Sequence, residues 1–331
     1  PDAVLLLSFG GPEGPDDVIP FLENVTRGRG IPRERLAAVG EHYGLFGGVS
    51  PINQQNRDLL AALRTELDQA GIDLPLYWGN RNWHPFLADT AREMVADGHR
   101  RVVVIVTSAF GSYSGCRQYR EDLAQAAADL DGAISFTKVR SYWNHPGFLD
   151  AMVDRVNHAL DTLDDQQRAD TRLVFTAHSI PSAWIPTSPY VDQLQAAAEH
   201  LARETAPDNP WDLVYQSRSG PPEVPWLGPD IVDHLHTLHD DGVASVVLVP
   251  LGFVSDHMEV VYDLDTEARA AADELGLHLV RAATAGTHPA FVRGLRQLVE
   301  EQLHATPALA VVGEPRPVPC PENCCDRPAR R

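Results

Sequence analysis

The sequence predicts an α/β protein made of two similar doubly wound, Rossmann-like domains, each built around a four-stranded parallel sheet. The chain has 331 residues, which is more than a single hydrophobic core usually serves. Short apolar runs rich in β-branched residues alternate with longer amphipathic stretches, as expected for strands that helices cover on both faces. The alternation has the same rhythm in both halves, which favours two domains over one large sheet.

Eight apolar runs are predicted to be strands, four in each half of the chain. They are residues 4–7, 76–79, 102–107 and 134–140 in the first half, and residues 173–176, 213–216, 245–249 and 279–282 in the second.

Helices are predicted where apolar residues recur every three or four positions. In residues 57–70, for example, Leu59, Leu63 and Leu67 share one face. The other predicted helices are residues 86–97, 118–129, 147–163, 191–204, 230–240, 266–275 and 289–304.

The predicted domain boundaries follow from these elements. We expect a first domain at residues 1–144, a second at residues 145–306 and a cysteine-bearing tail at residues 307–331. The last helix of the second domain is expected to pack back on the first domain. Prolines recur after it and end any further helix.

Composition narrows the class of protein. The net charge of −19 argues against a nucleic-acid partner, because no basic surface is available to displace phosphate counterions. No apolar run reaches membrane-spanning length and no secretory segment is evident, so we expect a cytoplasmic protein. Arg27 and Arg29 lie in a local basic segment, residues 27–35, which is either a landing site for a small anion or a solvated loop.

Cysteines are concentrated at the end of the chain. Cys320, Cys324 and Cys325 lie within the last dozen residues, and Cys116 lies about two hundred residues upstream. Four crowded thiolates are suited to an iron–sulfur cluster of the [2Fe–2S] or [4Fe–4S] type. Structural zinc and a tail of free thiols are the alternatives.

Ligands of doubly wound sheets bind at the carboxyl ends of the strands, so the residues that follow each strand are the candidates for chemistry. His178 ends a predicted strand and can accept a proton or ligate a metal. Glu259, Asp263 and Glu267 recur every fourth residue, which places them in one row along a helix. Such a row can conduct cations or protons, but a solvated helix face carries the same pattern.

Aromatic and polar residues near the strand ends suit a flat, anionic ligand. Phe9 and Trp226 are candidates to wall in an apolar plate. Ser50 and Tyr119, together with the arginines of the basic segment, are candidates for anion contacts. A dinucleotide is disfavoured because the turn after the first strand lacks the GxGxxG pattern.

Five motifs, in this order along the chain, resemble those of the ferrochelatase family. They are residues 7–12 (LSFGGP), 46–51 (FGGVSP), 176–181 (TAHSIP), 225–229 (PWLGP) and 252–259 (GFVSDHME). The resemblance extends over residues 3–305. It implies that ferrous iron is inserted into a porphyrin, with loss of two pyrrole protons, in a cleft between two similar domains.

The resemblance also implies roles for single residues. His178 is implied as the proton acceptor or transient iron ligand over the ring, and Glu259 as its acid–base partner. Asp263 and Glu267 match an acidic line that delivers metal or removes protons, and Trp226 matches a pocket wall. Two positions depart from the pattern of some relatives. Phe9 replaces a tyrosine able to ligate iron, and His42 replaces an arginine expected to contact a propionate.

The tail is similar to that of bacterial ferrochelatases that carry a [2Fe–2S] cluster. In those proteins one ligand comes from the body and three come from the C-terminus, which implies Cys116, Cys320, Cys324 and Cys325 as ligands here. The cluster is expected to be structural or iron-sensing, because porphyrin metalation needs no redox step.

The polar, basic stretch at residues 24–30 predicts the choice of porphyrin. Coproporphyrin III carries four propionates and protoporphyrin IX carries two, so a basic entrance favours coproporphyrin III as substrate and coproheme as product. The alternatives are a protoporphyrin IX ferrochelatase, a chelatase for another tetrapyrrole or metal, and a non-catalytic haem or porphyrin carrier. Transient contact with haem-pathway enzymes is left open.

Overall fold

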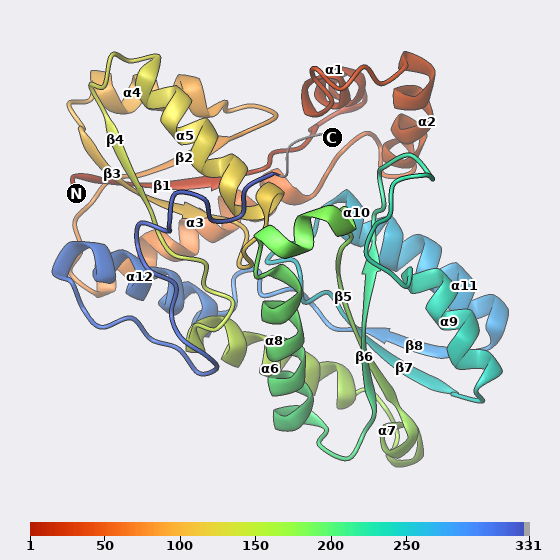
Figure 1. Cartoon of the computed structure of the whole chain (residues 1–331). Coiled ribbons are helices and arrows are strands. Elements are labelled where there is room, and N and C mark those ends of the chain that lie inside the picture. The colour runs from red at the N-terminus through yellow and green to blue at the C-terminus, as the bar shows by residue number, and fades with distance from the viewer. Residues whose placement is uncertain (328–331) are drawn as a thin grey trace.

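The computed structural model describes residues 1–327 and contains two separate parallel sheets (Figure 1). The first sheet has the strand order β2-β1-β3-β4 and the second has the order β6-β5-β7-β8, so the second repeats the topology of the first. All neighbouring strands pair in parallel. The predicted fold class is confirmed. The strands are β1 Ala3–Ser8, β2 Leu76–Asn80, β3 Arg101–Val106, β4 Ser135–Lys138, β5 Arg172–His178, β6 Trp211–Gln216, β7 Ser245–Val249 and β8 His278–Arg281.

Helices connect the strands and cover the sheets (Figure 1). The α-helices are α1 Pro15–Val25, α2 Arg33–Gly44, α3 Ile52–Gln69, α4 Leu87–Ala96, α5 Gln118–Ala128, α6 Pro146–Leu160, α7 Asp165–Asp170, α8 Tyr190–Thr205, α9 Ile231–Asp240, α10 Met258–Val261, α11 Arg269–Leu275 and α12 Pro289–His304. Three shorter turns have other geometries: η1 (Tyr113–Arg117) and η3 (Asp263–Ala268) are π-helical, and η2 (Ser182–Thr187) is a 3₁₀-helix.

Helices α1 and α2 were not predicted from the sequence, for two different reasons. Pro20 lies inside α1, and a proline inside a helical pattern reads as a helix breaker. In α2 only Leu36 is buried, so this helix has no apolar stripe from which its period can be recognised.

The two sheets are joined by one continuous apolar core. The largest buried cluster contains Val4 and Ile105 from the first sheet and Phe175 and Val247 from the second. Helices α6 and α12 lie between them: they pack against each other, and α12 also contacts α3 and β3 of the first half. The last helix of the chain thus contributes to the core of both halves.

A buried ion pair holds the chain where it leaves α12. The guanidinium of Arg140 contacts the carboxylate of Glu301 at 3.0 Å, and their side chains are only 1% and 7% exposed. Arg140 also donates a hydrogen bond to the carbonyl of Leu309, and Asn144 donates to the carbonyl of Val312. These bonds direct residues 309–312 back across the first half. Within residues 1–327, no helix combines the length and apolar character needed to cross a membrane.

His145 caps α6 and predicts a specific pH dependence of stability. Its Nδ1 accepts a hydrogen bond from the backbone N–H of Gly147 at 3.0 Å, and the residue is 1% exposed. Burial, followed by the charge of Arg140, lowers the pKa of His145 from 6.5 to about 4. The unfolded chain therefore binds a proton between pH 6.5 and pH 4 that the native protein does not. Folding should lose about 3 kcal/mol from this group across that window.

The variant His145→Asn isolates this effect, because asparagine caps a helix equally well and does not titrate. Urea unfolding at pH 7, 5.5 and 4.5 should show a smaller loss of unfolding free energy on acidification for the variant than for the wild type. Parallel losses in the two proteins would contradict the assignment.

Candidate active site

The two sheets reverse their strand order at equivalent points, and the candidate residues gather there. In the second sheet the reversal lies between β5 and β7, and ligands of doubly wound sheets bind at this position. His178 is the last residue of β5, and Glu259 lies in α10, after the loop that follows β7. The loop approaches β5 closely at Gly252, where a Cβ atom would lie 2.7 Å from the Cα of Ala177. Glycine is therefore required for this approach.

His178 and Glu259 form a facing pair. The imidazole Nε2 lies 3.3 Å from the carboxylate Oε1, and the two side chains remain 32% and 45% exposed. Nδ1 of His178 is bonded to the carbonyl of Ser179, which requires Nδ1 to carry a proton. Tyr190 donates a hydrogen bond to the carbonyl of His178 at 3.0 Å and fixes the end of the strand. The pair is thus oriented by its surroundings but open on one side.

His178 and Glu259 strongly shift each other's pKa. Burial by itself would lower the pKa of His178, but the adjacent carboxylate of Glu259 outweighs it and raises that pKa to about 9. Burial would likewise raise the pKa of Glu259, and the neighbouring imidazolium instead lowers it to about 2. At neutral pH the pair therefore consists of an imidazolium, protonated at both Nδ1 and Nε2, and a carboxylate.

The predicted row of carboxylates continues from this pair through a π-helical turn. Asp263 begins η3 and accepts a hydrogen bond from the hydroxyl of Ser217. Burial, reinforced by the charges of Glu259 and Glu267, raises the pKa of Asp263 to about 7. The row was predicted on a regular α-helix. The π-turn widens the helix where the acidic residues lie, and single π-turns are frequent at functional sites.

Several residues near this pair were not singled out from the sequence. His257 caps α10 by accepting from the N–H of Glu259 at 3.1 Å, which fixes the backbone of the catalytic candidate. Tyr43 faces the acidic row: burial and the charges of Glu259 and Asp263 raise its pKa. Tyr43 belongs to no strand-end motif that would identify it as part of this site, whereas His257 lies in the motif at residues 252–259.

His42 lies across the junction of the two halves. Its ring stacks on Tyr262 with centroids 3.8 Å apart and an interplanar angle of 8°. This contact links α2 of the first half to the residue that follows α10 in the second. His42 was predicted to contact a propionate, and in this structure the stacked tyrosine occupies one face of its ring.

The two predicted aromatic wall residues lie in different environments. Phe9 follows β1, is 38% exposed and makes an edge contact with Phe21 at 6.2 Å. The indole of Trp226 lies over Gly220, where a Cβ atom would come within 2.2 Å of Nε1. That indole nitrogen is buried without a hydrogen-bond partner in the described part of the chain.

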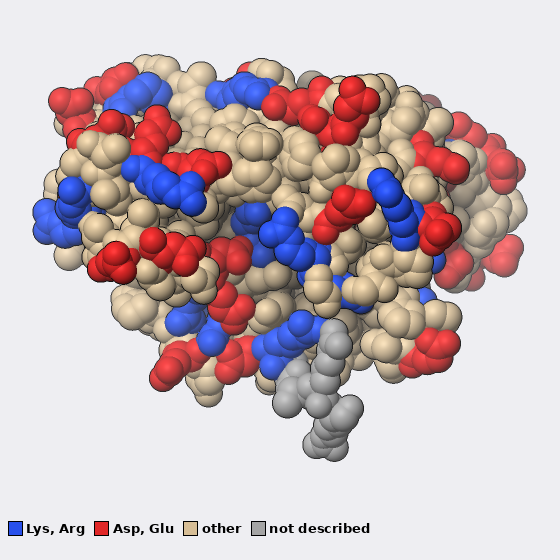
Figure 2. Space-filling view, turned by 90° about the horizontal axis from the view of Figure 1, so that it is seen from above, with Lys and Arg blue, Asp and Glu red and all other residues tan. Residues whose placement is uncertain are grey.

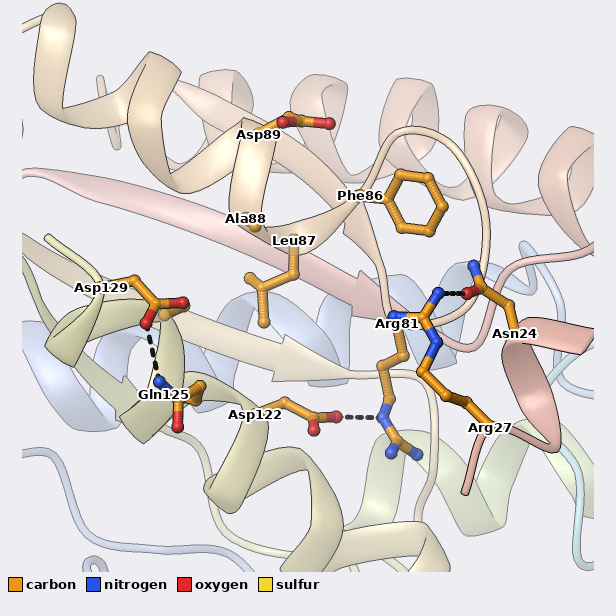
Figure 3. A pocket seen from close by; sticks show the side chains of 11 residues that line it. Asn24, Arg27, Arg81, Phe86, Leu87, Ala88, Asp89, Asp122, Gln125 and Asp129 are labelled. Atoms are coloured by element: carbon orange, nitrogen blue, oxygen red, sulfur yellow. Dashed lines mark hydrogen bonds and ion pairs between the residues drawn. The ribbon is translucent and has the colours of Figure 1, made fainter. Parts of the chain in front are cut away.

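The four residues predicted to contact an anion do not lie together around one site. Ser50 and Tyr119 are both 4% exposed, so they offer little surface to a ligand. Arg27 donates to Asn24 and lines a separate pocket of about 540 Å³ between the end of α1, the start of α4 and α5 (Figure 3). Arg29 is exposed and lies outside that pocket lining.

Arg81 connects this pocket to Tyr119. Its guanidinium lies 4.5 Å from the centroid of the Tyr119 ring and pairs with Asp122 (Figure 3). A guanidinium over the face of an aromatic ring makes a favourable cation–π interaction with it. The role of Tyr119 in this structure is thus to support a buried arginine.

Comparison with known proteins identifies the family. The Ferrochelatase family model matches residues 1–303. The chain belongs to the ferrochelatase family. Coproporphyrin III ferrochelatase of Streptomyces coelicolor is 53% identical, covering 99% of this chain and 94% of that protein. Coproporphyrin III ferrochelatase of Mycolicibacterium smegmatis is 51% identical, covering 96% of this chain and 94% of that protein.

Solved structures agree with the fold at much lower sequence identity. SirB from Bacillus subtilis with Fe3+ is 14% identical and covers 91% of this chain and 96% of its own, with a TM-score of 0.55. At this identity the likeness concerns the fold alone. The chain is therefore a ferrochelatase-family member on a chelatase-type fold.

Cys116 lies near the three tail cysteines in the structure of this ferrochelatase-family chain, although about two hundred residues separate it from them in the sequence. Cys116 lies in the π-turn η1 and is 5% exposed, and Cys325 is 1% exposed. The Sγ atoms of Cys324 and Cys325 are 3.5 Å apart. Hydrogen bonds from the thiols of Cys320 and Cys325 lower the pKa of Cys116 to about 2.

Cationic groups surround this cysteine site. Arg316 donates to Sγ of Cys324 at 3.1 Å, and Lys138 also lowers the pKa of Cys116. Positive neighbours stabilise thiolates, which are the ligand form of cysteine. As placed here, no three or more His, Cys, Asp or Glu side chains of residues 1–327 are grouped to hold a metal ion. The donor set and its charge nevertheless suit a group bound by four thiolates.

An exposed apolar surface follows the basic segment, and it was not predicted. Ile31, Val39, Leu45 and Val49 are all at least 36% exposed, and Leu45 reaches 67%. These residues lie in and around α2. The first half of the ferrochelatase-family fold thus presents apolar as well as basic side chains beyond residues 24–30.

Proposed function

We propose that this protein is a coproporphyrin III ferrochelatase, which inserts Fe(II) into coproporphyrin III to give coproheme. The observation that carries the proposal is the facing pair of His178 and Glu259 at the strand-order reversal of the second sheet. Membership in the ferrochelatase family and about 50% identity to relatives named coproporphyrin III ferrochelatase support the same activity.

The proposed reaction releases two protons, because the porphyrin loses two N–H hydrogens when it takes up one Fe(II) ion. Nε2 of His178 already holds a proton at neutral pH, so this nitrogen becomes a base or metal ligand only after passing that proton on. Glu259, 3.3 Å away, is the nearest acceptor. An incoming cation disfavours the positive charge on the ring, so the Nε2 proton would pass to Glu259 and the free nitrogen would face the porphyrin.

Asp263 is suited to carry protons away from the pair. A carboxyl group with a pKa of about 7 both accepts and releases a proton near neutral pH, which is the condition for efficient proton transfer. Glu267 lies one π-turn further along the same row. We propose that this row, from Glu259 to Glu267, serves as the proton exit or the metal path.

Substrate contacts complete the proposed site. Trp226 and Phe9 would face the porphyrin plane, and Arg29 and His42 would meet its propionates. Arg27, Ser50 and Tyr119, which were predicted for the same purpose, are placed less favourably because the first lines a separate pocket and the other two are buried. The porphyrin would then lie between the two halves.

We further propose a [2Fe–2S] cluster held by Cys116, Cys320, Cys324 and Cys325. Four cysteine thiolates are the usual ligand set of such a cluster. The support lies in the convergence of one body cysteine with three tail cysteines and in the basic residues beside them. When bound, the cluster would cross-link the tail to the first half and supply a redox-active centre that metalation itself does not use.

Cellular placement and partners follow from the proposed chemistry. Iron–sulfur and free thiol groups persist in reducing compartments, so we propose a cytoplasmic location. The product must pass to a later enzyme of haem synthesis, and a transient contact with such an enzyme is compatible with this role.

An anaerobic metalation assay tests the proposed function. Purified protein and ferrous iron are mixed with coproporphyrin III in one cuvette and with protoporphyrin IX in another. Each additional charge-assisted hydrogen bond to a propionate is worth about 1.5–3 kcal/mol, so we expect coproporphyrin III to be used at least about tenfold more efficiently. Preference for protoporphyrin IX would overturn the substrate choice. Turnover of neither would favour a chelatase for another tetrapyrrole or a carrier.

A further inference from the structure

The C-terminal tail is fixed at the junction of the two halves. The backbone N–H of Cys325 donates to the carbonyl of Thr187 at 3.0 Å, and the Thr187 hydroxyl donates to the carbonyl of Asp326 at 2.7 Å. From the other half, Arg117 contacts the Asp326 carboxylate at 2.8 Å. Residues 325 and 326 are therefore held from both sides, and this determines where Arg327 lies.

Arg327 extends over two aromatic rings, one from each half. Its guanidinium carbon is 5.9 Å from the ring centroids of both Tyr113 and Trp184. The two rings make an edge contact with centroids 5.3 Å apart. Such cation–π contacts fix the side chain of an exposed arginine. Arg327 remains exposed, so it can contact a ligand.

A second arginine comes near this position without a counterion. Partial desolvation of the exposed Arg29 side chain, and after it the charges of Arg327 and Arg81, lowers the pKa of Arg29, which indicates that the three guanidinium groups lie near one another. Arg81 is neutralised by Asp122. Among residues 1–327, neither Arg29 nor Arg327 has a carboxylate within 4.0 Å.

The acidic side chains nearest to this pair are already occupied. Glu121 accepts from the hydroxyl of Tyr113 at 3.1 Å and pairs with Arg117 at 3.0 Å, and Asp326 pairs with the same arginine. Arg29 and Arg327 thus place two uncompensated positive charges near each other in a chain of net charge −19. Basic side chains also gather near the middle of the face shown in Figure 2, with acidic ones around them.

The position of these arginines relates them to the active site. Tyr113 lies in the segment that follows β3, and Trp184 is six residues beyond His178, which ends β5. Both segments therefore leave the carboxyl ends of central strands, where a ligand of either sheet binds. We propose that Arg327, beside Arg29, binds one carboxylate arm of the porphyrin substrate. The proposal rests on the proposed function, since it assigns an arm of that substrate.

This role would link the cysteine-bearing tail to the substrate site. The cysteine site fixes residues 320–325, and Asp326 alone separates it from Arg327 at the rim. Loss of the cysteine site would remove this positive charge from the entrance. The tail would thus affect porphyrin affinity without taking part in the transfer of iron.

The test compares Arg327→Gln and Arg327→Lys with the wild type in the full chain. Arg203→Gln is the matched control, because Arg203 is 60% exposed in α8 and is assigned no role. Two readouts are needed: the Kd for coproporphyrin III from porphyrin fluorescence without iron, and the KM and kcat of metalation. Iron and sulfide content should match the wild type in every variant, which verifies that the tail is intact.

For Arg327→Gln we expect Kd and KM for coproporphyrin III to rise about tenfold with kcat within twofold, because one charge-assisted contact is lost. Arg327→Lys should recover most of the affinity, and Arg203→Gln should behave like the wild type. An unchanged Kd in Arg327→Gln would overturn the proposal. Weaker binding by this variant with no metalation by any protein would retain the carboxylate contact and overturn only the ferrochelatase activity. Absence of coproporphyrin binding by the wild type would overturn both.

Discussion

Replacing His178 by alanine should lower the rate of coproporphyrin metalation by about 10²–10⁴-fold, the usual contribution of a positioned acid–base group. The imidazole lies 3.3 Å from Glu259 at the end of a central strand. The other nearby ring, His257, lies 3.9 Å from Glu259 and caps α10 through its Nδ1. The loss should appear in kcat, and the Kd for the porphyrin should change little. Single-turnover absorption measurements under anaerobic conditions separate the two quantities.

His236→Ala is the matched control for this variant. His236 is an exposed histidine of α9, and its removal should leave both kcat and Kd unchanged. Circular dichroism and thermal unfolding should show that both variants are folded. Metalation at the wild-type rate by His178→Ala would show that the catalytic assignment is wrong.

The position of the proposed catalytic pair was predictable from the sequence because of the sheet topology. Parallel strands end at one edge, and His178 follows directly on an apolar run whose strand character is clear from its β-branched residues. The sequence also showed Glu259 after β7, a later strand of the same half. The sequence did not predict the distance between His178 and Glu259. This distance depends on the close approach of Gly252 to Ala177.

Contacts between the two halves could not be predicted in the same way. The stacking of His42 on Tyr262 and the placement of Arg327 over Tyr113 and Trp184 join residues more than seventy positions apart. No periodicity in the chain links such residues. The burial of Tyr119 was missed for a related reason, because its partner Arg81 comes from a different strand-end loop.

The two π-turns illustrate a further limit of the sequence. No regular structure was predicted for residues 113–117, and residues 263–268 were predicted to follow an α-helical period. Each segment instead forms a π-helix. The first contains Cys116 and the second contains Asp263. A π-turn is less stable than a regular α-helical turn, so its presence at both candidate sites indicates that functional side chains determine the local backbone.

Replacing Cys325 by serine should lower the iron and sulfide content of the purified protein by at least about tenfold. Outer-shell partners of a metal site already contribute 10–100-fold to metal affinity, and a direct ligand should contribute no less. Cys325 is also 1% exposed and bonded through its N–H to Thr187, so a serine there leaves a buried hydroxyl without a metal. We expect the visible absorption of the cluster to disappear and the tail to become sensitive to proteolysis.

Two further variants separate the roles of ligand and neighbour. Ser114→Ala changes an exposed residue in the same π-turn as Cys116 and should keep the wild-type iron content. Arg316→Gln removes the hydrogen bond to Sγ of Cys324 and should lower cluster occupancy less than Cys325→Ser does. Since binding of a metal group by four thiolates is coupled to folding of the segment that supplies them, tail proteolysis should follow iron content across all three variants. Colourless wild-type protein with stoichiometric zinc would instead assign the four cysteines to a structural zinc site.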